Sequence, residues 1–153
     1  MKTLVFQKES RMPCSAAELF AWHESPGAFT TLLPPGEPVT VVHHDGHIRN
    51  GAKAIIRVGK WPFRFRWELM HESYVNGHQF CDVQLTGPFR YYRHEHVMRN
   101  IEPGTCVLSD TITFSMPLGV IGYWIGKWFV MRKFDRLFAF RHDVTLKAIQ
   151  RHG

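Results

Sequence analysis

The stretch of sequence that decides the fold is the last quarter of the chain, Pro117–Gly153, which reads PLGVIGYWIGKWFVMRKFDRLFAFRHDVTLKAIQRHG. No further proline interrupts it, and it predicts one helix of about thirty residues, which would span about 45 Å at about 1.5 Å per residue. Helices in globular proteins average about 11–12 residues. A helix of this length needs a sheet that packs along it.

Mostly apolar side chains recur along this predicted helix at spacings of three, four or seven residues, which places them on one face. They are Val120, Trp124, Trp128, Met131, Phe134, Phe138 and Thr145. A second apolar row, formed by Ile121, Ile125 and Phe129, covers another face of the helix start. We therefore expect the core on the first face, and a pocket entrance or a partner on the second.

Length and composition indicate one globular domain, residues 1–153, with 44% hydrophobic and 21% charged residues. Three cysteines without CxxC spacing argue against a disulfide framework or a zinc site, and they predict a reduced, cytoplasmic setting. The N-terminus becomes polar too soon for a secretory signal. The apolar run 116–131 is shorter than the roughly 20 residues that span a bilayer.

The net charge of +6 is concentrated in the C-terminal helix. A basic helix of this kind can meet anionic lipid, an acidic ligand or an acidic partner, although a solvated basic face is the favoured interpretation. Peripheral contact with an anionic membrane and a homodimer seated on the aromatic helix start both stay open. Nucleic acid fits poorly, because no basic segment lies outside the helix and no recognition module is present.

The residues before this helix predict a strand, two short helices and then six strands joined by turns. We expect the first strand over 2–10 and the helices over 16–23 and 27–32, with Ser15 as N-cap of a capping box that includes Glu18. Strands that follow one another through short turns form an antiparallel meander. The six later strands are expected at Val39–His44, Lys53–Val58, Phe63–Ser73, Gln79–Thr86, Phe89–Met98 and Thr105–Ser115.

This order of elements, together with several local strings, resembles the START-like, helix-grip superfamily that is also labelled SRPBCC. The strings are Phe80–Gln84, Gly87–Phe89, Tyr92–His96, Asp110–Gly119 and Phe138–His142. They look like a bacterial subgroup found alone or fused to a sugar-nucleotide epimerase-like domain. The resemblance implies an α+β helix-grip fold, in which a curved antiparallel seven-stranded sheet wraps around the long helix. It also implies a hydrophobic pocket between sheet and helix, suited to a lipid, a polyketide or an aromatic molecule.

Strand alternation places polar side chains of three neighbouring strands on a common inner face. If the strand registers coincide, Asp82, Gln84, His94, His96 and Asp110 meet beneath the helix, whereas a one-residue slip would turn one strand's set to the other side. The apolar residues expected to line the ligand pocket with them are Tyr92, Met98, Ile112, Phe114, Trp124, Trp128, Met131, Phe134 and Phe138.

Several chemistries fit this polar set. A carboxylate bonded to a histidine orients the ring and raises its pKa, so His94, His96 and Asp110 are the candidate catalytic residues of a cyclase, dehydratase or isomerase. A satisfied polar network, or polar groups that orient a bound ligand, would use the same residues. Metal binding by the two histidines with Asp82 or Asp110 fits in geometry, but an HxH pair is weak evidence, so no metal and no other cofactor is expected.

The leading interpretation is a protein that binds or carries a hydrophobic small molecule between the sheet and the C-terminal helix. The first alternative is an enzyme that uses a pocket histidine as acid and base. The second is a membrane-surface or protein-interaction module that acts through the apolar helix start.

Overall fold

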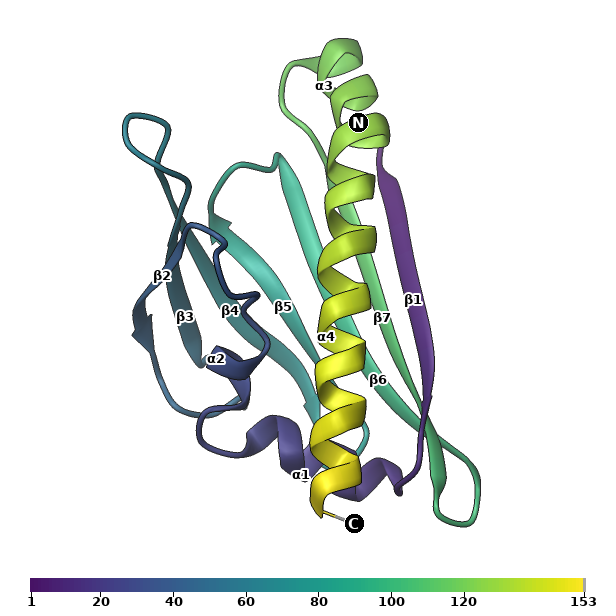
Figure 1. Cartoon of the computed structure of the whole chain (residues 1–153). Helices are drawn as coiled ribbons and strands as arrows, with labels where there is room; N and C mark the ends of the chain where they lie inside the picture. The colour runs from purple at the N-terminus through teal and green to yellow at the C-terminus, as the bar shows by residue number, and fades with distance from the viewer. Residues whose placement is uncertain (153) are drawn as a thin grey trace.

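The computed structural model describes residues 1–152, and its main element is a seven-stranded antiparallel sheet that curves around one long helix (Figure 1). The sheet order is β1-β7-β6-β5-β4-β3-β2, so the first strand pairs with the last and the others follow as a meander. The strands are β1 (Leu4–Met12), β2 (Val39–His44), β3 (Lys53–Val58), β4 (Phe65–Val75), β5 (Gln79–Thr86), β6 (Tyr91–Glu102) and β7 (Thr105–Ser115).

Two short helices, α1 (Ala16–Glu24) and α2 (Ala28–Thr31), follow β1 and lie across one end of the sheet (Figure 1). The predicted capping box starts α1: the Ser15 side chain accepts from the Glu18 backbone N–H, and the Glu18 carboxylate accepts from the Ser15 backbone N–H. The C-terminal helix is continuous through α3 (Gly119–Ile125), one π-helical segment (Gly126–Val130) and α4 (Met131–His152). Its predicted end at Gly153 lies outside the described residues.

The predicted α+β helix-grip fold is confirmed, and most strand limits agree with the prediction. The strands β1, β4 and β6 differ, because each begins two residues later than expected. The segment before β4 forms a turn, in which the Phe63 N–H donates to the Lys60 carbonyl, so pairing begins at Phe65. At its other end β6 stays paired with β7 as far as Glu102, since the hairpin turns only at Pro103-Gly104.

Two apolar clusters fill the space between α4 and the sheet. The cluster beside β1, β7 and β6 is dominated by aromatic rings, with centres 5.3 Å apart for Phe6 and Phe138 and 5.3 Å apart for Phe114 and Phe134. The second cluster joins α1 and the end of α4 to the sheet through residues such as Leu19, Phe20, Met98, Leu108 and Ile149. This interface is closely packed.

The start of the helix extends past the sheet into solvent (Figure 1). The expectation that Val120, Trp124 and Trp128 face the core was wrong, because their exposed fractions are 61%, 49% and 52%. The second apolar row is also exposed, with 69% for Ile121 and 70% for Phe129. The helix is longer than the strands beneath it, so burial of the predicted row begins near Met131 and is complete at Phe134, Phe138 and Thr145.

Across residues 1–152, no helix combines the length and the apolar character that crossing a membrane requires.

Candidate functional site

A cavity of about 190 Å³ lies beside α2, between the segment that follows α1, the loop that joins β2 to β3, and the inner face of strands β2 to β6. Its apolar lining includes Phe29, Leu32, Leu69 and Phe80. Its polar lining includes His23, His44, His71, Asp82, His96 and Arg141. The sheet half that carries β2 to β5 is therefore where the fold leaves room for a ligand.

A buried network of histidines and aspartates borders this cavity and continues inward to the helix. Its members are His71 on β4, Asp82 on β5, His94 and His96 on β6, Asp110 on β7 and His142 on α4. The strand register brings them together, since His71 pairs with Asp82, Asp82 with His94, and His96 with Asp110 across neighbouring strands. The registers needed for the predicted convergence of Asp82, His94, His96 and Asp110 are thus present.

Asp110 is the inner centre of the network. Its Oδ1 lies 2.7 Å from His94 Nε2 and 2.8 Å from His96 Nδ1, and its Oδ2 lies 2.6 Å from His142 Nε2. A carboxylate oxygen only accepts, so His94 Nε2 and His142 Nε2 donate to Asp110, whereas His96 Nδ1 makes an ion-pair contact outside hydrogen-bond geometry. The remaining nitrogen of His142, Nδ1, lies 2.7 Å from the Ser10 hydroxyl, which donates to it.

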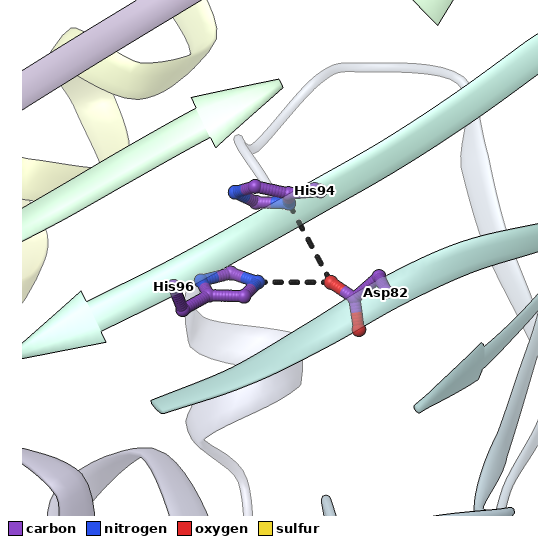
Figure 2. A group of neighbouring side chains, drawn as sticks. All are labelled: Asp82, His94 and His96. Carbon is purple, nitrogen blue, oxygen red and sulfur yellow. Dashed lines mark hydrogen bonds and ion pairs between the residues drawn. The ribbon is translucent and has the colours of Figure 1, made fainter. Parts of the chain in front are cut away.

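Asp82 is the outer centre and is one of the residues that line the cavity. Its Oδ2 lies 2.9 Å from His96 Nε2 and 3.5 Å from His94 Nδ1, so both rings present a nitrogen to the same oxygen (Figure 2). Its Oδ1 lies 2.5 Å from His71 Nδ1, although the angle of this contact falls outside hydrogen-bond geometry. His94 and His96 therefore sit between two carboxylates.

The electrostatics of the network keep both carboxylates ionised. Burial raises the pKa of Asp82, but its polar contacts with His71, His94 and His96 outweigh burial and hold that pKa well below its usual range. Burial also raises the pKa of Asp110, but the charge of His96 and the contacts with His142, His94 and His96 lower that pKa by more. For His96, burial lowers the pKa, yet the charge of Asp110 and the contacts with both aspartates raise it to about 9. A positive charge is thus held between the two aspartates near neutral pH.

Arg141 brings a second cationic group to the cavity from α4. Its Nε donates to the Leu32 carbonyl at 3.2 Å, and its guanidinium carbon lies 5.2 Å from the centre of the Phe138 ring. Burial lowers the pKa of this guanidinium. Within residues 1–152, no carboxylate lies close enough to form an ion pair with Arg141, so its other N–H groups are available to a ligand.

The structure separates the predicted site residues into those of the network and those of the core. Asp82 and His96 line the cavity, and His94 and Asp110 lie directly behind them. The expectation that Gln84 joins this set was wrong, because its amide donates to the Phe89 carbonyl at 2.7 Å and accepts from the Phe89 N–H at 3.3 Å. Gln84 stabilises the turn between β5 and β6.

The apolar residues predicted to line the pocket occupy other positions. Tyr92, Ile112, Phe114, Phe134 and Phe138 pack against one another in the aromatic cluster, with Met131 at its margin. Met98 belongs to the second cluster, while Trp124 and Trp128 are half-exposed on the helix start. None of these residues is among those that line the cavity. Large rings fill the space under the helix, so the open volume lies beside α2 instead.

Sequence reasoning missed His71, His142 and Arg141. His142 follows Phe138 by four residues and precedes Thr145 by three, so it continues the buried row of the predicted helix face. His71 follows Leu69 by two residues on a strand, which places both on the cavity face. The periodicity of helix and strand thus indicated that both histidines are buried. For Arg141 the only indication was its position next to His142, within the string Phe138–His142 that resembles the START-like superfamily.

Comparison with known proteins places this fold among START-like, helix-grip structures. Norcoclaurine synthase from Thalictrum flavum matches with a TM-score of 0.74 and 16% identity over 99% of this chain and 96% of that chain. Another structure of that enzyme contains dopamine and hydroxybenzaldehyde. A START superfamily protein from Mycobacterium smegmatis matches with a TM-score of 0.68 and 12% identity over 95% of this chain and 98% of that chain.

A nucleoside-diphosphate sugar epimerase from Corynebacterium glutamicum matches with a TM-score of 0.69 and 21% identity. The match covers 95% of this chain but 29% of the epimerase. No family model matches the sequence, and the search of curated proteins finds no match. At these identities the comparisons establish the fold, and the function has to be argued from the site.

Proposed function

We propose that the protein binds or carries a hydrophobic small molecule of lipid, polyketide or aromatic type in the cavity beside α2. The observation that carries this proposal is the cavity itself, where Phe29, Leu69 and Phe80 face a polar wall formed by Asp82 and His96. Apolar pockets with a few convergent polar groups are typical of ligand sites. A protein of similar fold, norcoclaurine synthase, binds dopamine and hydroxybenzaldehyde in one of its structures, which supports the proposal.

The size and charge of the cavity narrow the ligand class. Sites for drug-sized ligands have volumes of about 300–1,000 Å³, so a cavity of about 190 Å³ suits a small aromatic or short-chain molecule better than a full-length lipid. Arg141 presents free N–H groups to the cavity, and guanidinium groups favour carboxylate and other oxygen acceptors. An aromatic ring with an oxygen-bearing substituent would contact the apolar lining through the ring and Arg141 through the oxygen.

The test is native mass spectrometry of gently purified protein, combined with displacement of a fluorescent aromatic probe. We expect a bound mass or saturable probe binding, and a loss of at least about tenfold in probe affinity when Leu69→Trp fills the cavity. Leu85→Trp, at an exposed position on β5, is the matched control and should bind the probe unchanged. Absence of both a bound mass and displaceable probe would refute the proposal.

A cyclase, dehydratase or isomerase is the second candidate. Its supporting observation is the position of Asp82 and His96 in the cavity wall, where a polar side chain could pass a proton to or from the bound molecule. Norcoclaurine synthase, in a structure that contains two small aromatic molecules, offers a parallel in fold. A panel of cyclic ketones and polyketides tests it: turnover that His96→Gln leaves unchanged, or no turnover at all, would count against this candidate.

The exposed helix start supports the third candidate, a module that contacts an anionic membrane or another protein. Leu118, Ile121 and Phe129 are each more than two-thirds exposed, and Lys127 lies among them. Co-sedimentation with phosphatidylserine vesicles, compared with phosphatidylcholine vesicles, tests the membrane contact, which should weaken with added salt. We also propose a reduced, cytoplasmic setting for the protein. The free, buried state of Cys14, Cys81 and Cys106 supports this setting.

A further inference from the structure

Three potential metal-ligand atoms converge at the polar wall of the cavity. Figure 2 shows the rings of His94 and His96 facing one oxygen of Asp82, at 3.5 Å from His94 Nδ1 and 2.9 Å from His96 Nε2. All three atoms lie within 4.8 Å of one another. Ligand atoms about 2.0–2.2 Å from a metal ion, at angles between 90° and 110°, are about 2.9–3.5 Å apart. The two separations between a histidine nitrogen and the Asp82 oxygen match this spacing.

Asp110 fixes the tautomer that metal binding requires at His94. It accepts a hydrogen from His94 Nε2, so Nδ1 of that neutral ring carries a lone pair, which faces Asp82. His96 Nδ1 lies 2.8 Å from the same Asp110 oxygen, which places a carboxylate beside this nitrogen when a metal ion replaces the hydrogen on Nε2. In metal sites a bound histidine almost always donates its other N–H to a carboxylate or carbonyl. Asp110, itself held by His142, is the carboxylate beside both histidines here.

His94 Nδ1 and Asp82 Oδ2 face each other at 3.5 Å as a lone pair and a carboxylate oxygen, which repel one another in a buried site. His96 Nε2 donates to the same oxygen at 2.9 Å. A metal ion that takes the place of this hydrogen would accept all three lone pairs.

The cavity provides access and an open coordination position. Asp82 and His96 line it, while His94 is buried behind them with a side-chain exposure of 2%. Two imidazoles and one carboxylate suit a divalent first-row transition metal, and three protein ligands leave a position for water or a ligand oxygen. We infer that Asp82, His94 and His96 bind one divalent transition-metal ion whose open face is directed into the cavity beside α2.

The experiment uses full-length protein without an affinity tag, stripped with a chelator and titrated with Zn²⁺ by calorimetry and with Co²⁺ by visible absorption. We expect one equivalent of each metal to bind, with Co²⁺ bands typical of four or five nitrogen and oxygen ligands. Asp82→Asn and His96→Gln should each weaken Zn²⁺ binding by at least about 100-fold. Asp82→Asn keeps the shape of the side chain, so it remains informative if the histidine variant folds poorly.

The surface pair His43 and Asp45 provides a matched control, because its Nε2 and Oδ1 lie 2.6 Å apart on an exposed turn. The His43→Gln, Asp45→Asn double variant should bind Zn²⁺ as the wild type does. Binding weaker than about 100 μM in the wild type, or affinity that Asp82→Asn leaves unchanged, would overturn the inference. The measurement contains no organic ligand, so its outcome is independent of whether the cavity binds a small molecule.

Discussion

The two halves of the C-terminal helix show how little the hydrophobicity of a segment says about its burial. Residues 118–129 are apolar on nearly every side, yet Leu118, Ile121 and Phe129 are exposed to solvent. The later half carries the charged residues, yet it buries His142 and Thr145 together with Phe138. The sheet extends beneath the second half and ends short of the first. Burial follows the extent of the opposing layer.

The largest effect should come from removing the aromatic ring that anchors the buried half. Phe138→Ala would leave a cavity among Phe6, Phe134 and Arg141, and we expect a loss of about 3–5 kcal/mol in the free energy of unfolding. Phe129→Ala, in the exposed half, should change it by less than about 0.5 kcal/mol. Urea denaturation measures both, and equal losses would contradict the comparison.

A smaller loss is expected from the buried polar residue of the same half. His142→Ala removes the hydrogen bond to Asp110 and leaves the Ser10 hydroxyl without its partner, which should cost about 1–3 kcal/mol. Asp143→Ala changes the next residue, whose side chain is half-exposed and bonds only Lys147 among the described residues, and should cost less than about 0.5 kcal/mol. A neutral His142→Ala would show that the network does not stabilise the fold.

The junction between the two halves lies at Gly126, a buried residue of the helix that faces the first residue of β1. A Cβ atom there would stand 2.8 Å from Met116 Cγ and 2.9 Å from Leu4 Cδ1. Gly126→Leu should therefore cost about 1–2 kcal/mol through overpacking, despite its better helix propensity. Lys127→Leu, at the exposed neighbouring position, should be close to neutral in the same thermal melts. If Gly126→Leu leaves the stability unchanged, the packed half of the helix begins later than Gly126, within α4.

Substitutions at the exposed start of the C-terminal helix should have the smallest effect on stability. They should have the largest effect on association with a membrane or a partner. The double variant Ile121→Ser, Phe129→Ser should leave the free energy of unfolding within about 0.5 kcal/mol of the wild type. It should also reduce binding to anionic vesicles, or dissociate a dimer seen by analytical ultracentrifugation. Unchanged behaviour in both assays would show that the apolar half of the helix has no partner of either kind.

Much of the fold was predictable because its signals are local. Turn residues and strand alternation predicted β2, β3, β5 and β7 at their observed limits, and the capping box of Ser15 and Glu18 predicted α1. The inner polar face was predictable only as far as strand register allowed. His94 and His96 had to share a face, since they are two residues apart on one strand.

The rest depended on contacts between distant segments. The contact between Asp110 and His142 joins β7 to α4, and the contact between Asp82 and His71 joins β5 to β4. Neither pairing leaves a local pattern in the sequence. The cavity position was missed for a related reason. Rings such as Phe6 and Phe114 fill the space under the helix, so the unfilled volume lies where α2 and the β2–β3 loop cover the sheet.

The sequence by itself determined the order of strands and helices, which side chains of one strand share a face and the apolar character of the start of the long helix, because these follow from backbone periodicity and local composition over a few residues. The tertiary structure decided which half of that helix is buried, where a cavity remains and which histidines share Asp110. Those outcomes depend on the relative lengths of sheet and helix and on how side chains from remote segments fill a common volume.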